Sequence, residues 1–416
     1  MIWPEGKIAH ADKPPSRRWW ERQHVMQVIA TGMTVTLTLL LGFRRFYMYG
    51  HNDFPTWIRA FYQNHIYKEN FTRDPLFGQV DFSRLEQGRL RGQFWSVYVE
   101  CPKTDPADQS DETYFETLRD TFQQIDLVHR LIKSHPEALA LADSSAGVQE
   151  LFQSGRTQIA SLLGIEGLHQ IANSASVLRL YHALGFRYAN LTHECRNTFA
   201  DSATPPTPQH HGLSPVDRAA LIYEMNRVGM VVDLAHVSHA TMRDALALTR
   251  TPVIFSHSSA FALFHHERNV PDHVLDLVRL NAGVVMVSFY PAYTRCADPA
   301  RACIADVADH IQYIGQRIGY QHVGLGSDFD RMPIGVRGLE DVSHYPDLIR
   351  ILVERGVPVK ELAGVVGGIV LRALGAAEDV AASMAEEEPL EDSVKPFSLR
   401  RVYATLGYNR YYHRIA

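Results

Sequence analysis

Short apolar runs at regular intervals are the feature that most limits how this chain can fold. Eight runs have the length and the Val, Ile, Leu and Tyr content of buried β-strands, at 46–49, 94–99, 159–165, 188–192, 230–235, 252–256, 284–289 and 323–326. Segments of helical periodicity fall between nearly all of them. Strands that alternate with helices form a parallel sheet, so eight such units predict an α/β protein with a (β/α)₈ TIM-like barrel.

Helix boundary signals support this alternation. Ser214 followed by Pro215 is a typical helix start, and the amphipathic run after it stops at Gly229. Pro271 opens another helix, which closes near Gly283. The same periodicity predicts further helices at 115–131, 177–184, 242–248, 307–318 and 348–353.

The chain is longer than a barrel alone requires. Its 416 residues exceed the ~250 of a typical (β/α)₈ barrel. We therefore divide it into a basic N-terminal segment (1–24), a candidate membrane span (25–43), the barrel (44–380) and a C-terminal tail (381–416). The charge balance is 41 Lys and Arg against 46 Asp and Glu, with no basic stripe, which argues against nucleic acid as a partner.

The N-terminal segment carries the targeting signal. Residues 25–43 contain no formal charge, and the basic residues before them are Lys7, Lys13, Arg17, Arg18 and Arg22. This pattern predicts a single transmembrane anchor with a cytoplasmic N-terminus and an extracellular or lumenal barrel. A cleaved signal peptide, which would make the protein secreted, and a wrongly extended start are the alternatives.

Cysteine usage agrees with an oxidising compartment. The four cysteines form no CxxC zinc pattern. Cys101 and Cys195 follow two predicted strands and are placed to form a disulfide at the barrel top, while Cys296 and Cys303 are close enough in sequence to close a loop. Four free thiols are the alternative. Asn70 opens an N-glycosylation sequon in a predicted loop, which makes the chain a candidate glycoprotein.

Five acidic or imidazole side chains stand where predicted strands end: His51, Asp53, Glu166, His236 and His257. A barrel gathers its catalytic groups at the C-terminal ends of its strands, so these side chains are expected to meet. Imidazole and carboxylate suit Zn²⁺, and the set indicates a two-metal hydrolase. One histidine alone is more often a core residue than a ligand, and there are 21 here, so the shared position at strand ends carries the prediction.

Ten ordered motifs between Tyr49 and Leu374 resemble the membrane (renal) dipeptidase family of zinc metallopeptidases, most closely its anchored fungal-type members. They are GHNDFP, GQFWSVYVEC, GIEGLH, RYANLTHEC, GLSP, DLAHVSHATM, PVIFSHSSA, RNVPD, GSDFD and GLEDVSHYPDLI. The resemblance implies two zinc ions per chain, dipeptide hydrolysis by a hydroxide that bridges them, and a homodimer. It implies one zinc on His51 and Asp53, the other on His236 and His257, and Glu166 as a catalytic bridge.

The resemblance also implies three substrate-handling residues. His193 matches the histidine that polarises the scissile carbonyl, and Arg268 matches the arginine that holds the substrate carboxylate. Asp328 matches the acid/base that moves a proton from water to the leaving amine. Asn52 and Tyr290 are expected to line the pocket.

Three positions depart from the family pattern. Tyr49 stands where an Asp usually precedes GHND, Leu168 replaces a Gly, and Ile369 replaces an Asn. An Asp at position 49 would orient a ligand histidine, so its loss is expected to weaken activity. Two alternatives therefore stay open. One is a related binuclear hydrolase of amides, lactams or peptide conjugates in secondary metabolism, and the other is a barrel that binds without turnover.

Overall fold

The computed structural model describes residues 47–67, 76–105, 107–204, 211–215, 218–295 and 298–394. The predicted basic segment, the candidate span at 25–43, the Asn70 sequon and the tail from 395 onward lie outside these residues. Among the residues described, no helix has both the length and the apolar character that a membrane crossing requires.

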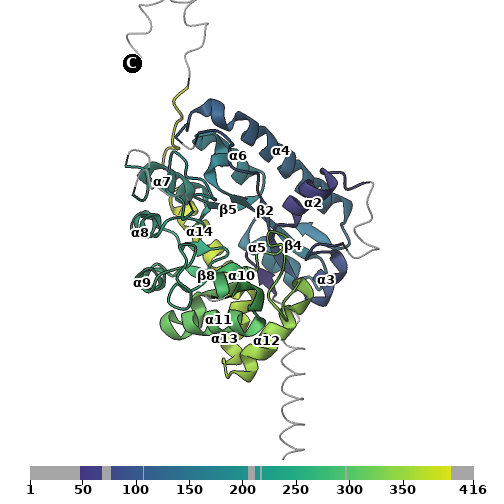
Figure 1. Cartoon of the computed structure of the whole chain (residues 1–416). Helices are drawn as coiled ribbons and strands as arrows, with labels where there is room; N and C mark the ends of the chain where they lie inside the picture. Colours follow the sequence, from purple (N-terminus) through teal and green to yellow (C-terminus); the bar gives the residue numbers. More distant parts are fainter. Residues whose placement is uncertain are drawn as a thin grey trace, which may run out of the picture. The chain divides into compact units, whose positions relative to one another are not determined.

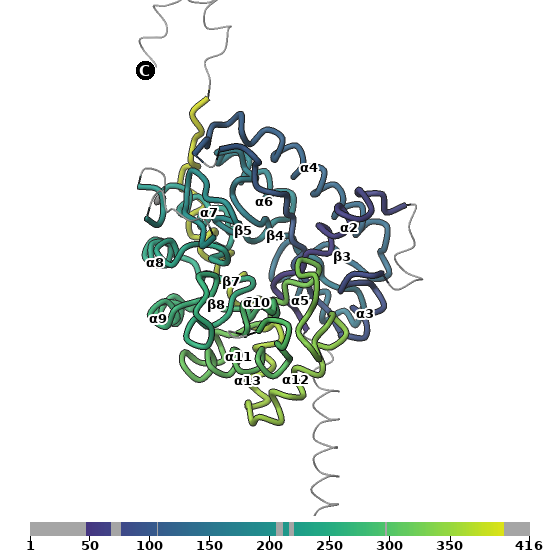
Figure 2. Tube along the Cα trace, in the orientation of Figure 1, coloured from purple at the N-terminus to yellow at the C-terminus, as the bar shows by residue number. Residues whose placement is uncertain are grey.

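A parallel barrel forms the body of the molecule (Figures 1 and 2). Neighbouring strands pair in parallel all along the path. In spatial order they are β1 (Met48–Tyr49), β2 (Gly92–Val97), β4 (Ile159–Glu166), β5 (Phe186–Asn190), β6 (Val231–Asp233), β7 (Ile254–Phe255), β8 (Val284–Val287) and β9 (Val323–Leu325). All eight predicted strands are present in the predicted order, which confirms the (β/α)₈ fold.

The barrel is nearly closed between its first and last strands. The Gly50 N–H donates to the Leu325 carbonyl at 2.9 Å, and the Asp53 N–H donates to the Phe329 carbonyl at 2.9 Å. One further strand, β3 (Leu139–Leu141), pairs with β4 outside this path. The sequence does not predict β3, because this strand has only three residues and ends on an exposed leucine.

Helices separate the strands and cover the barrel (Figure 1). Their bounds are α2 (Phe54–Tyr62), α3 (Phe82–Gln87), α4 (Asp111–Ser134), α5 (Ser145–Gln153), α6 (Ala175–Ala183), α7 (Arg218–Val228), α8 (His239–Leu248), α9 (Asp272–Asn281), α10 (Pro291–Thr294), α11 (Ile304–Ile318), α12 (Tyr345–Glu354), α13 (Val359–Ala363) and α14 (Ile369–Ser383). Serine caps begin several of them. Ser144, Ser174 and Ser238 each accept a backbone N–H from the first turn of α5, α6 and α8.

The barrel interior is packed with side chains from the strands, among them Met48, Phe94, Leu162, Tyr188 and Met286. Gly164 in β4 pairs with Tyr188 in β5. A Cβ at position 164 would lie 2.0 Å from Cζ of Tyr188, so only glycine leaves room for that ring. The ring position matters because its hydroxyl reaches the mouth of the barrel.

One predicted disulfide is present. Cys101 and Cys195 are bonded, with 6.0 Å between their Cα atoms, and they join the loops that follow β2 and β5. Cys303 is not disulfide-bonded and precedes α11, while Cys296 lies outside the described residues. The expectation of a second bridge to Cys303 is therefore wrong for this structure.

Candidate metal centre

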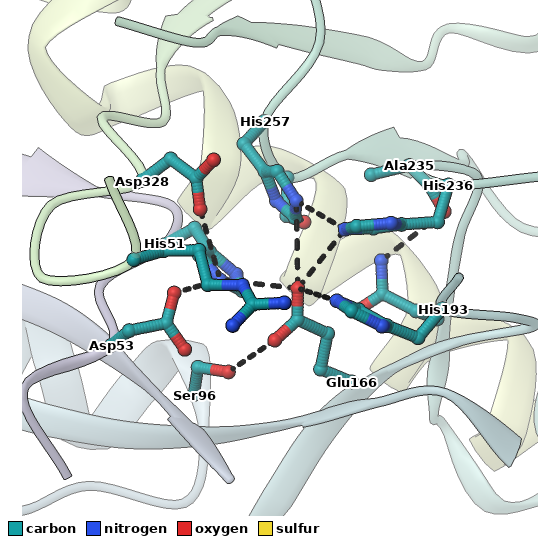
Figure 3. A network of polar contacts seen from close by, with 12 residues as sticks. His51, Asp53, Ser96, Glu166, His193, Ala235, His236, His257 and Asp328 are labelled. Carbon is teal, nitrogen blue, oxygen red and sulfur yellow. Dashed lines mark hydrogen bonds and ion pairs between the residues drawn. The ribbon is translucent and has the colours of Figure 1, made fainter. Parts of the chain in front are cut away.

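The barrel mouth brings the predicted metal ligands together (Figure 3). Each ligand stands at or just after the end of a strand, and all five are buried: His51, Asp53, Glu166, His236 and His257. The predicted substrate residues His193 and Asp328 lie in the same cluster. His236 and Asp328 have positive φ angles of 70° and 68°, a conformation uncommon outside glycine and typical of functional sites.

One oxygen of Glu166 is the meeting point of four imidazole rings. Its Oε1 lies 3.1 Å from Nε2 of His236, 3.5 Å from Nε2 of His257 and 3.6 Å from Nε2 of His51. Nε2 of His193 is 3.8 Å away. The position of Glu166 therefore suits a carboxylate shared between two groups of ligands, and its role as a bridge stays a prediction.

Two pairs of ligands flank this carboxylate. Nε2 of His51 lies 3.1 Å from Oδ2 of Asp53, and Nε2 of His236 lies 2.8 Å from Nε2 of His257. Possible ligand atoms in three overlapping groups of the cluster lie within 4.8 Å of one another. The assignment of one metal to each pair stays a prediction.

Burial and crowding shape the electrostatics of the cluster. Burial raises the pKa of Glu166 to about 8, with a further rise from Asp53. Burial likewise raises the pKa of Asp328 to about 7, although His51 opposes that rise. Burial would lower the pKa of His51, but the carboxylates of Glu166 and Asp53 outweigh it and raise the pKa to about 10. A divalent cation bound among these carboxylates would offset both the desolvation cost of their burial and their mutual repulsion.

The donor atoms fit such a cation. Among the described residues, both ring nitrogens of His193, Nδ1 of His236 and Oδ1 of Asp328 are buried without a hydrogen-bond partner. Leaving a buried polar atom unpaired costs about 1–3 kcal/mol, so the cluster is organised for something else to bind. Imidazole nitrogen and carboxylate oxygen are ligands that Zn²⁺ accepts.

Three hydroxyl groups contact the proposed ligands and fix their orientation. None of the three was predicted from the sequence. The Tyr188 hydroxyl lies 3.0 Å from Nδ1 of His51, and the Ser256 hydroxyl lies 2.9 Å from Nδ1 of His257. The Ser96 hydroxyl donates to Oε2 of Glu166 at 3.0 Å. The only sign of them in the sequence was that Tyr188 and Ser96 belong to predicted strands that lie next to strands with predicted site residues.

Tyr49, which stands where the family pattern has an Asp, has a packing role in this structure. Its ring stacks on Tyr345 with 3.7 Å between centroids and 6° between planes. Position 49 therefore supplies no carboxylate to His51. The Tyr188 hydroxyl contacts Nδ1 of the His51 ring instead.

Arg268 faces the same mouth from the loop after β7. It is only 3% exposed, and within the described part of the chain none of its guanidinium nitrogens has a hydrogen-bond partner. Its Cζ lies 5.2 Å from the centroid of Tyr293, which stacks on Tyr290. The side chain of Asn52, which was expected to line the pocket, accepts the backbone N–H of Phe54. A buried, unpaired guanidinium suits a substrate carboxylate.

Comparisons with known proteins find relatives of this chain. A family model described as membrane dipeptidase (peptidase family M19) matches residues 44–388. The dipeptidase aclJ of Aspergillus oryzae is 60% identical over 351 residues, which cover 84% of this chain and 82% of that protein.

Two solved structures share the fold. The probable dipeptidase PvdM from Pseudomonas aeruginosa has a TM-score of 0.73 at 21% identity and covers 84% of this chain and 100% of its own. A metallopeptidase from Rhodobacter sphaeroides, liganded with a phosphinate mimic of the dipeptide L-Ala-D-Ala, has a TM-score of 0.69 at 21% identity. That match covers 80% of this chain and 99% of the other.

Proposed function

This chain belongs to the membrane dipeptidase family of metallopeptidases, peptidase family M19, and we propose that it hydrolyses dipeptides at a centre of two zinc ions. The observation that carries the proposal is the convergence of four imidazole rings on Oε1 of Glu166. Beside it stands Arg268, a buried guanidinium with no hydrogen-bond partner among the described residues, as a peptidase of substrates with a free C-terminus would require.

The ligand assignment divides the cluster into two halves. His51 and Asp53 would hold one zinc, His236 and His257 would hold the other, and Glu166 would serve both. When bound, the two ions would supply a hydroxide at neutral pH and would polarise the scissile carbonyl. The hydroxyls of Tyr188, Ser256 and Ser96 fix the orientation of three of these ligands.

Three side chains act on the substrate itself. His193 donates an N–H to the carbonyl oxygen and stabilises the negative charge that develops there. Arg268 pairs with the C-terminal carboxylate and thereby selects substrates of dipeptide length. Asp328 accepts a proton from the attacking water on Oδ1 and transfers it to the leaving amine.

The environment of the protein follows from its N-terminal segment and its disulfide. We propose that residues 25–43 anchor the chain and that the barrel lies outside the cell or in a lumen. The Cys101–Cys195 bond supports this, since disulfides persist in oxidising compartments. Cleavage of the segment would give a secreted enzyme with the same site.

Metal content and a dipeptide panel test the proposed function. Purified protein restored with zinc is expected to hold about two zinc ions per chain and to cleave dipeptides with free C-termini. Zinc binding with no cleavage of any dipeptide would contradict the activity. An intact fold that holds no zinc would favour a barrel that only binds.

Arg268 distinguishes a dipeptidase from a related amide or lactam hydrolase. Arg268→Ala is expected to lower kcat/KM for dipeptides with a free carboxylate on the order of hundredfold, because a buried charge pair is lost. Turnover of the matching C-terminal amides is expected to change far less. An equal loss on both substrates would favour the related hydrolase.

A further inference from the structure

A second arginine stands at the mouth of the barrel, and neither the metal centre nor the proposed chemistry uses it. Arg331 lies in the loop after β9, close behind Asp328 in sequence. Its Cζ lies 5.0 Å from the centroid of Tyr98, and the Tyr98 ring lies 4.4 Å from the ring of His193. One aromatic ring therefore separates this guanidinium from the proposed carbonyl-binding histidine.

Arg331 and Tyr98 line a hollow of about 670 Å³, whose other walls are α2, α4 and the loop after β2. Tyr98, which contacts the His193 ring, is its link to the proposed metal centre. Two other cations of its lining already have partners. Arg59 pairs with Asp120 at 2.7 Å, and Lys103, which pairs with Glu100, is 86% exposed, so water screens its charge. Arg331 is 33% exposed, close to the 28% of Arg59, but its carboxylate partner is more distant, at 3.5 Å instead of 2.7 Å.

The carboxylate that faces Arg331 holds it loosely. Glu194 approaches its Nη2 at 3.5 Å and is itself 56% exposed. An exposed ion pair of this length contributes little free energy, so another carboxylate can replace Glu194 at small cost. Stacking on Tyr98 meanwhile keeps the guanidinium in place.

The barrel order sets the direction in which a substrate would lie. Arg268 follows β7, and Tyr98 follows β2, which is four strands from β7 in either direction around the nearly closed barrel. The ends of these two strands therefore lie on opposite sides of the barrel mouth, with Arg268 in the long loop after β7, where it contacts Tyr293. A dipeptide whose C-terminal carboxylate rests on Arg268 extends its N-terminal residue toward Tyr98 and Arg331.

We propose that Arg331 determines substrate specificity by pairing with a carboxylate on the side chain of the substrate's N-terminal residue. This inference rests on the proposed dipeptidase function and adds the preferred substrate class, dipeptides that begin with an acidic residue. The bidentate geometry of a guanidinium with a carboxylate supports a preference of roughly tenfold over the uncharged isostere.

Two matched substrate pairs test the proposal in the zinc-loaded full chain. The first pair is Glu-Ala and freshly dissolved Gln-Ala, and the second is Ala-Glu and Ala-Gln. The readout is the ratio of kcat/KM within each pair, because a uniform loss of activity cancels in a ratio. The wild type is expected to prefer Glu-Ala over Gln-Ala about tenfold.

Variants separate charge from packing. Arg331→Met keeps an aliphatic stem over Tyr98 and is expected to bring the Glu-Ala ratio close to one, whereas Arg331→Lys retains part of the preference. Glu194→Gln removes the competing carboxylate and is expected to raise the ratio above that of the wild type. Arg337→Met, at an exposed arginine later in the same loop, serves as the control and leaves the ratio unchanged.

Several results would overturn the inference. A wild-type ratio near one, or a ratio that Arg331→Met does not change, removes the role of Arg331. Dependence on Arg331 in the Ala-Glu pair instead of the Glu-Ala pair contradicts the proposed direction of the substrate. Wild-type turnover of Ala-Ala shows which proposal has failed. A protein that cleaves no dipeptide contradicts both the dipeptidase function and the role of Arg331, whereas one that cleaves Ala-Ala without preferring Glu-Ala contradicts only the role of Arg331.

Discussion

At the scale of single residues, the side chains that meet at the barrel mouth could be predicted but their supports could not. His51, Glu166 and His257 each end an apolar run, and a strand end is visible in a sequence. Tyr188 bonds to His51 across 137 positions of the chain, so its role depends on how two strands are placed in the barrel. The orientation of a ligand is a tertiary property, and one sequence gives no access to it.

Tyr188→Phe tests this support. Losing the hydroxyl is expected to weaken zinc binding about tenfold, because partners of metal-bound histidines typically contribute 10–100-fold to affinity. Competition with a chelator measures the affinity directly, without reference to activity. Tyr181→Phe is the matched control, since its buried hydroxyl donates to the Gln170 carbonyl at 2.8 Å away from the ligands. Equal zinc affinity in Tyr188→Phe and the wild type would remove the positioning role.

At the scale of elements, the long periodic helices followed from the sequence and the short or covered ones did not. The predicted helices at 307–318 and 348–353 correspond to α11 and α12, whose apolar faces repeat at helical spacing. Helix α14 was not predicted, although several of its residues belong to the core cluster. Its run is rich in alanine and buried over much of its length, so it lacks a strong polar face.

Glu224 links two helices and the segment after α14, and it makes their stability depend on pH. It accepts hydrogen bonds from Arg179 of α6 at 2.8 Å, from Arg227 of α7 at 2.8 Å and from the Leu390 N–H at 3.1 Å. Burial alone would raise the pKa of Glu224, but these bonds hold it below its ordinary value of 4.5. The stabilisation is therefore complete above pH 4.5 and is lost as the pH falls through the lowered pKa.

Glu224→Gln is thus expected to lower Tm at pH 7 and to reduce the acid sensitivity of Tm below pH 4.5. Thermal unfolding followed by circular dichroism over a pH series measures both effects. Glu354→Gln is the control, because Glu354 pairs with Arg350 on the surface and is 60% exposed. A variant that loses stability in acid as steeply as the wild type would show that other groups control the acid response.

At the scale of the whole molecule, the sequence indicated the barrel, its strand order and the Cys101–Cys195 bond. These features follow from the spacing of strands and from the rule that parallel strands end at one face. It did not indicate β3 or the unpaired state of Cys303, which depend on local packing. The hollow beside Tyr98 was also hidden, since side chains from α2, α4, the loop after β2 and the loop after β9 form it together.

The disulfide is expected to stabilise the barrel as a whole. It joins positions 94 residues apart, and removing a native bond of this kind typically costs about 2–5 kcal/mol. The double variant Cys101→Ala/Cys195→Ala is therefore expected to unfold at lower denaturant concentration than the wild type. Cys303→Ser, which keeps a capping side chain before α11, is expected to unfold like the wild type. Identical midpoints for all three proteins would contradict a stabilising role.

Gly164 and Tyr188 have a consequence for anyone who redesigns this barrel. A methyl group at position 164 would overlap the Tyr188 ring, and that ring carries the hydroxyl that meets His51. The two positions therefore behave as a single unit in a mutant library. A larger residue at 164 becomes acceptable only with a smaller one at 188, and that exchange takes the hydroxyl away from His51, a proposed metal ligand. Attempts to fill the interior for thermal stability would reduce metal retention through this pair, so such libraries should leave both positions fixed.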